Sequence, residues 1–96
     1  MFFTLVQNNS GGYFIINDDV SEFVIIEANN VIEATKRAKE ITKDYMEYCF
    51  CCGERWDYDF TEDDKYDKPS IWGNPINEKD SGIRIYYLDG RIEKID

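Results

Sequence analysis

The sequence contains no histidine, only two prolines and few basic residues. Without histidine, the chain has no Ser-His-Asp or Cys-His catalysis, no imidazole acid–base chemistry and no imidazole metal ligand. Lys and Arg number 11 against 20 Asp and Glu, so the net charge is −9. A protein that grips the nucleic-acid backbone or an anionic membrane needs a basic face. We therefore expect neither direct nucleic-acid binding nor membrane binding.

Long apolar runs are also missing, and none approaches the ~20 residues that a membrane-spanning helix needs. The first nine residues contain no Lys or Arg and too short an apolar stretch for a signal peptide, which favours a cytosolic protein. Hydrophobic residues make up 43% of the 96 residues and aromatic residues 16%, enough for a packed core. A chain of this length accommodates one such core, so residues 1–96 are expected to form a single domain.

Runs of branched and aromatic residues predict about five strands, at 2–7, 13–16, 22–28, 82–88 and 91–95. The turn-forming residues 8–12 predict a hairpin between the first two runs. The Asp89-Gly90 pair predicts a two-residue hairpin between the last two, since both turn positions would need a positive φ. The third run is almost continuously apolar, which indicates a central, well-covered strand.

One long helix of about five turns is predicted over residues 31–48. Its apolar residues recur every three or four positions and form one face, and Asn29-Asn30 precede it as a cap. We expect an α+β fold in which an antiparallel sheet packs against this helix. Residues 53–82, with many charges and with Gly and Pro, are predicted to be irregular apart from a short strand near 56–60.

The cysteine-bearing segment follows the predicted helix. Cys49, Cys51 and Cys52 fall within four residues, and reduced cytosolic thiols in such a cluster are typical metal ligands. Zinc prefers a tetrahedron of thiolates, with another donor where thiolates are too few. The predicted cofactor is a structural zinc, which would also stabilise a thin core. The open choices for its fourth ligand are Asp44, Glu47, Glu54, Asp57 or water.

Two other interpretations of the cysteines stay open. Some of them would be buried small hydrophobes, or Cys51 and Cys52 would form a strained vicinal disulfide with redox chemistry. A thiol-dependent enzyme would need a low-pKa cysteine beside a positive charge, and Arg55 alone is near in sequence.

Negative charge is concentrated in two regions, residues 1–30 and 51–80, and it is densest over residues 54–67. The carboxylates predicted to bind a partner, interleaved with aromatic residues, are Asp57, Asp59, Glu62, Asp63, Asp64 and Asp67. Such a surface suits a basic protein partner. The alternatives are a solvated loop and, more weakly, a calcium site, although the spacing of an EF-hand is missing. Trp72, on a Gly- and Pro-containing loop, is either an exposed contact residue or a cover for the core.

Four motifs together resemble a family of small uncharacterised bacteriophage proteins. They are the Q-N-N-S-G-G of residues 7–12, the V-I-I-E-A of residues 24–28, the C-x-C-C-G-E-R-W of residues 49–56 and the S-I-W-G-N-P-I of residues 70–76. Some members carry a further cysteine before the third motif, which this chain lacks, so the resemblance does not supply a fourth ligand.

The chain is also similar to zinc-binding anti-CRISPR proteins. That resemblance implies a phage-encoded, non-catalytic inhibitor in the cytoplasm of the infected bacterial host. Its partner would be the host CRISPR effector nuclease, the RNA-guided DNA nuclease of a type II system, whose loading with target DNA it would impede. Such a nuclease holds nucleic acid in positively charged channels. The alternative is a small thiol- or metal-dependent phage accessory enzyme, or a structural component.

Overall fold

The structure is a computed structural model that describes residues 1–9, 12–46, 55–58 and 60–96. Its elements are, in chain order, β1 (Phe2–Val6), β2 (Phe23–Glu27), α1 (Val31–Thr42), the short 3₁₀ helix η2 (Glu62–Asp64), β3 (Ser70–Ile71), β4 (Asn74–Pro75), β5 (Ile83–Tyr86) and β6 (Ile92–Ile95). The α+β class is confirmed. In the described ranges, no helix is long and apolar enough to cross a membrane.

The main sheet has four strands in the order β1-β2-β5-β6. Its outer pairs, β1 with β2 and β5 with β6, are antiparallel, but β2 and β5 are parallel. The prediction of an antiparallel sheet was therefore wrong. The physical reason is that the chain leaves β2 through α1, and a helical crossover brings the next strand of the sheet in parallel. The predicted central position of β2 is confirmed.

The predicted strand at 13–16 does not form, and β1 pairs with β2 instead. The side chain of Gln7 forms hydrogen bonds with the backbone of Ile15 in this run. Its Oε1 accepts from the Ile15 N–H at 2.7 Å, and its Nε2 donates to the Ile15 carbonyl at 3.0 Å. A buried amide side chain thus replaces a strand partner, which no local pattern of apolar residues reveals.

Helix α1 begins where the sequence predicts. Asn30 is its N-cap and accepts from the Glu33 N–H at 2.9 Å. The helix has 12 residues, however, and ends at Thr42, so the prediction of a long helix to residue 48 was wrong. The Tyr45 carbonyl accepts a hydrogen bond from the indole of Trp56 at 2.9 Å, where the predicted helix would have an intrahelical bond. Past Thr42 the spacing is no longer α-helical, since the Tyr45 N–H donates to the Thr42 carbonyl at 2.8 Å, and the contact with Trp56 holds Tyr45 in this conformation.

The terminal hairpin between β5 and β6 is confirmed, but its turn is longer than predicted. Tyr87 N–H donates to the Arg91 carbonyl at 2.9 Å, which closes a loop of three residues. Gly90 alone in this loop has a positive φ, of 95°. This is the combination of a turn and a left-handed glycine that is common in three-residue hairpins. The predicted strand at 56–60 is reduced to one isolated bridge between Trp56 and Gln7.

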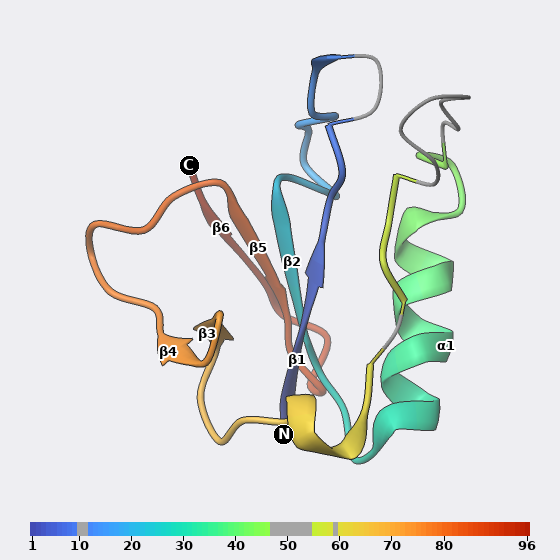
Figure 1. Cartoon of the computed structure of the whole chain (residues 1–96), viewed down its shortest axis with the longest axis vertical. Coiled ribbons are helices and arrows are strands. Elements are labelled where there is room, and N and C mark those ends of the chain that lie inside the picture. Colours follow the sequence, from blue (N-terminus) through green and yellow to red (C-terminus); the bar gives the residue numbers. More distant parts are fainter. Residues whose placement is uncertain (10–11, 47–54, 59) are drawn as a thin grey trace.

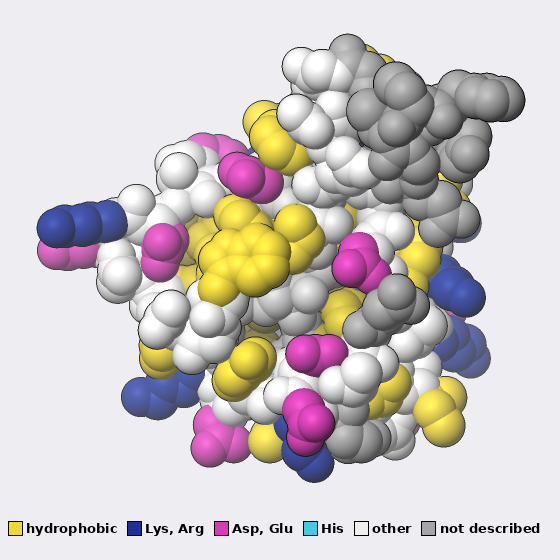
Figure 2. Space-filling view, viewed as in Figure 1, with side chains coloured by type: hydrophobic (Ala, Val, Ile, Leu, Met, Phe, Trp, Pro, Cys, Tyr) yellow, Lys and Arg dark blue, Asp and Glu magenta, His cyan; other side chains and the backbone are white. Residues whose placement is uncertain are grey.

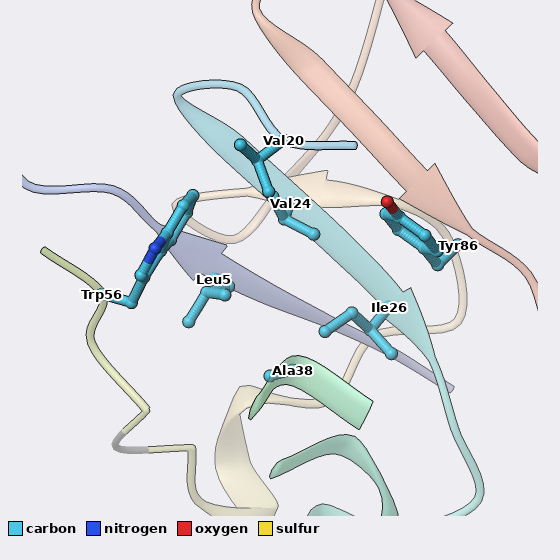
Figure 3. Packing of buried hydrophobic residues seen from close by; sticks show 7 residues of the cluster. All are labelled: Leu5, Val20, Val24, Ile26, Ala38, Trp56 and Tyr86. Atoms are coloured by element: carbon cyan, nitrogen blue, oxygen red, sulfur yellow. The ribbon is translucent and has the colours of Figure 1, made fainter. Parts of the chain in front are cut away.

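Both faces of the sheet are covered, as Figure 1 shows. Helix α1 lies on one face, where buried side chains of the sheet meet Ala38 and Trp56; Figure 3 shows the members of this cluster: Leu5, Val20, Val24, Ile26, Ala38, Trp56 and Tyr86. The small β3–β4 hairpin covers the other face. Its Ile71, together with Ile76, packs against a second cluster of Phe2, Ile25, Ile83 and Ile85. Burial on both faces explains the continuous apolar run of β2.

Candidate functional site

Two of the sequence motifs meet at a buried hydrogen-bond network. Arg55 is 2% exposed, and its Nη1 donates to Gln7 Oε1 at 3.0 Å and to the Tyr13 carbonyl at 3.0 Å. Gln7 Nε2 also donates to the Ser21 carbonyl at 2.8 Å. The arginine thus ties the loop after β1 to the segment that follows the cysteines. Sequence reasoning assigned no such role to Gln7 or Arg55, which lie 48 positions apart.

Trp56 anchors the same segment from its other side. The indole is 2% exposed and packs with Leu5 (Figure 3). It donates a hydrogen bond to the Tyr45 carbonyl at 2.9 Å. Residues 45 and 56 are therefore held together. The Arg-Trp end of the C-x-C-C-G-E-R-W motif is structural.

The predicted metal ligands Cys49, Cys51 and Cys52 lie outside the described residues, as do Glu47 and Glu54. The remaining ligand choices, Asp44 and Asp57, are both exposed. Among the residues that the structure describes, no three potential metal ligands are grouped. The zinc site stays a prediction.

Residues 55–58 and 60–66 run beside the outer edge of β1, on the side of α1 (Figure 1). Phe2 and Tyr66 form one bridge, with hydrogen bonds of 2.7 and 3.0 Å, and Gln7 and Trp56 form the other. Between the two bridges β1 needs far fewer residues than the partner segment. The described residues of that segment, which we call the arch, therefore cannot all lie along the strand, and none of them forms a bridge with the middle of β1.

A cavity of about 220 Å³ lies at the middle of β1. Thr4 and Val6 of β1 line it, and its other lining residues are three aromatic side chains, two carboxylates and a glycine: Phe60, Tyr66, Trp72, Asp57, Asp64 and Gly73. The cavity therefore joins an open strand edge to aromatic walls and negative charge. We call the five aromatic and acidic residues among these, Asp57, Phe60, Asp64, Tyr66 and Trp72, the Trp72 face.

The predicted partner-binding carboxylates are divided by the structure. Asp57 and Asp64 line the cavity, whereas Asp63 and Asp67 are exposed and do not line it. Asp59 lies outside the described residues, and Glu62 opens η2. The acidic stretch is thus not a uniform surface, because the arch directs two of its members to one place.

Asp64 also shapes the arch. Its Oδ2 accepts from the Thr61 N–H at 2.7 Å and from the Thr61 hydroxyl at 3.1 Å, completing a capping box for η2. Both bonds end on one oxygen, and a carboxylate has about four acceptor sites. Oδ1 therefore keeps its acceptor capacity with respect to the described part of the chain.

Trp72 is exposed and does not serve as a buried cover for the core. It is 75% exposed, and its contact with Phe23 is edge-on, with ring centroids 6.3 Å apart at 88°. The covering role belongs to its neighbours Ile71 and Ile76. Trp72 also has a φ of 53°, and Gly73 has one of 81°. A left-handed backbone costs a side-chain-bearing residue roughly 1–2 kcal/mol.

Figure 2 shows the same face of the molecule as Figure 1. Hydrophobic side chains gather near its middle, acidic side chains lie around them, and basic side chains are mainly at the periphery. Most of the Trp72 side chain is exposed to solvent in these surroundings, and its backbone is left-handed. This makes the Trp72 face the best candidate for a functional surface in the described chain.

A separate polar cluster stabilises the face under α1. The Tyr86 hydroxyl donates to the Asp19 carbonyl at 2.5 Å, and the Tyr45 hydroxyl donates to Asp19 Oδ2 at 2.7 Å. Burial raises the pKa of Tyr86 to about 12, and the negative charge of Asp19 adds to this. These groups hold the loop before β2 on the sheet, so we assign them a structural role.

Comparison with known proteins gives one family. No curated protein and no solved structure matches the chain. A family model described as a domain of unknown function, DUF7296, matches residues 1–96. The match spans every element described above, including the Trp72 face and the Gln7–Arg55 network. The chain belongs to the DUF7296 family.

Proposed function

We propose that this chain is a non-catalytic binding protein that docks on a basic protein surface through its Trp72 face. The observation that carries the proposal is Trp72 itself, which is 75% exposed at a φ of 53° beside Asp57 and Asp64. Strained residues persist where the surrounding fold holds them, and they concentrate at functional sites.

The chemistry of the Trp72 face suits protein recognition. Tryptophan and tyrosine are frequent anchors of protein interfaces, since they supply a large rigid contact area. The carboxylates, with the net charge of −9, attract a basic partner over a longer range and raise its association rate. The same charge disfavours nucleic acid as the partner.

The proposed target is the host CRISPR effector nuclease. The sequence resemblance to anti-CRISPR proteins supports it, as does the positive charge of the channels in which such a nuclease holds nucleic acid. The chain would be phage-encoded, act in the cytoplasm of the infected bacterium and impede loading of target DNA. Zinc on Cys49, Cys51 and Cys52 would stabilise the stretch whose ends Tyr45 and Trp56 already hold together.

The test is the affinity for a purified type II nuclease bound to its guide RNA, measured at several salt concentrations. We expect binding that weakens as salt rises, because salt screens the attraction. Trp72→Gly should weaken it at least tenfold, since the anchor is lost while the turn is kept. Ile32→Ala is the matched control, because Ile32 is an equally exposed apolar residue on α1, at 80%.

Charge reversal tests the electrostatic half of the proposal. Asp63→Lys combined with Asp67→Lys should lower the affinity and flatten its dependence on salt, because both carboxylates are exposed near the face. An undetectable interaction with the nuclease would refute the target. Equal losses for Trp72→Gly and Ile32→Ala would refute the Trp72 face.

The alternative of a thiol-dependent accessory enzyme has less support. It requires a cation that stabilises a thiolate. The guanidinium of Arg55, the basic group nearest in sequence, donates from Nη1 to Gln7, Asn8 and Tyr13. The guanidinium is therefore held in the buried network by these bonds, which is a structural role.

A further inference from the structure

The open middle of β1 offers a backbone acceptor at the cavity. Odd-numbered residues of the strand bond to β2, as the Met1 carbonyl does to Ala28 N–H at 2.8 Å and Gln7 N–H to the Glu22 carbonyl at 2.9 Å. Even-numbered residues must therefore direct their backbone groups outwards. The backbone groups of Phe2 bond to Tyr66, whereas no described residue outside the sheet bonds to the backbone of Thr4, which lines the cavity.

Two carboxylates stand at the same cavity. Asp57 and Asp64 line it, and Asp64 keeps the acceptor sites of Oδ1 because its capping bonds use Oδ2. Together with Thr4 of the strand edge, residues that carry acceptor oxygens thus line the cavity from three separate positions of the chain. A ligand with several donors in a fixed plane satisfies such a set better than a single ammonium group does.

Aromatic side chains supply the walls. Phe60, Tyr66 and Trp72 line the cavity, and their faces suit a flat, delocalised cation. The volume of about 220 Å³ accommodates roughly seven water-sized groups at about 30 Å³ each, which is comparable to an arginine side chain. A bare metal ion would leave most of this space and its apolar walls unused.

We propose that this cavity binds an arginine side chain of the protein partner. The guanidinium lies between Asp57 and Asp64 and donates to the Thr4 carbonyl, and the apolar stem of the arginine packs against Trp72 and Tyr66. The inference rests on the proposed docking function and specifies what the Trp72 face recognises. It also gives the strained turn a purpose, since the turn places the indole at the mouth of the cavity.

The test uses N-acetyl-arginine methylamide as the probe and the isotope-labelled full chain as the receptor, observed by nuclear magnetic resonance. The two tryptophans give separate indole signals, and Trp56 is an internal reference because it is buried and bonded to Tyr45. We expect the Trp72 indole and the Thr4 amide to shift saturably, with the Trp56 indole unmoved. The citrulline analogue, which has the same shape without charge, should shift neither.

Two matched variants separate the cavity from general charge attraction. Asp57→Asn should weaken arginine binding at least fivefold, whereas Asp18→Asn, the same chemical change at an exposed carboxylate outside the cavity, should leave it within twofold. Trp72→Gly is a second variant that should abolish saturation while the other amide signals report an intact fold. Equal responses to arginine and citrulline, or equal effects of the two aspartate variants, would overturn the proposal.

The outcome of this experiment distinguishes a failure of the arginine cavity from a failure of the docking function. A chain that binds the nuclease through Trp72 but shows no saturable response to the arginine probe would refute the cavity and leave the docking proposal standing. A chain that binds the probe as expected but not the nuclease would refute the target alone.

Discussion

Substitution of Trp56 should lower the stability of the chain, whereas substitution of Trp72 should change it little. This contrast tests the division between core and functional surface. Trp56→Phe removes the indole donor from the Tyr45 carbonyl, and an unpaired buried acceptor costs about 1–3 kcal/mol. The smaller ring leaves a gap beside Leu5 that adds roughly 1 kcal/mol. We expect the free energy of unfolding to fall by about 2–4 kcal/mol.

Trp72→Gly should change stability little. With 75% of the side chain exposed, about a quarter of its roughly 250 Å² is buried. At about 25 cal/mol per Å², losing that contact costs roughly 1.5 kcal/mol. Glycine also relieves the left-handed strain at a φ of 53°, which is worth about 1–2 kcal/mol. The two effects oppose each other, so the net change is expected within about 1 kcal/mol.

Urea unfolding followed by far-ultraviolet circular dichroism measures both variants without depending on tryptophan fluorescence. A domain of this length has a total stability of about 5–14 kcal/mol, so a loss of 2–4 kcal/mol moves the midpoint clearly. The m-value should stay constant. If Trp72→Gly destabilised the chain as much as Trp56→Phe, Trp72 would be a core residue, and the reasoning that assigns it to recognition would be wrong.

Three further predictions concern the network, the buried tyrosine and the metal. Arg55→Lys should lower the unfolding free energy by about 2–3 kcal/mol in urea, because an ammonium cannot reproduce the forked bonds to Gln7 and the loop carbonyls; an unchanged midpoint would contradict this. The pKa of Tyr86 rises from 10.0 to about 12 on folding, so the folded state holds this proton more tightly. The resulting contribution of roughly 1–2 kcal/mol to stability is present below pH 10 and lost between pH 10 and 12. In the Tyr86→Phe variant, the unfolding free energy should therefore fall less steeply with pH over this range. Protein purified without chelator or histidine tag should contain one zinc per chain by mass spectrometry, and replacing Cys51 and Cys52 by Ser should remove it and lower the melting temperature; metal-free wild-type protein would refute the site.

Local chemistry explains what the sequence predicts correctly. Asn30 caps a helix because its short side chain reaches the Glu33 N–H, three residues away. The continuous apolar run of β2 indicates burial on both faces, and the structure has both. The terminal hairpin follows from Asp89-Gly90 between two branched runs. Each of these signals is contained within a few neighbouring residues.

The wrong predictions concern segments whose structure is determined by residues that are distant in the sequence. Residues 13–16 have strand-like side chains, but their partner is the amide of Gln7. The helix pattern continues past Thr42, but Trp56 takes the Tyr45 carbonyl. The candidate cavity was predictable in part, because Asp57, Asp64 and Trp72 were all singled out. Their meeting at the edge of β1 depends on two bridges, to Tyr66 and to Trp56, that no local spacing encodes.

The two bridges have a consequence for self-association. An edge strand with free backbone groups is a template on which further chains add, and long exposed edges of this kind lead to aggregation. Among the described residues, the bridges at Phe2 and Gln7 cover the two ends of β1 and leave a short stretch between them. That stretch admits a single side chain but is too short to register a whole incoming strand. The same arch that creates a recognition cavity therefore also protects the protein from polymerising through β1.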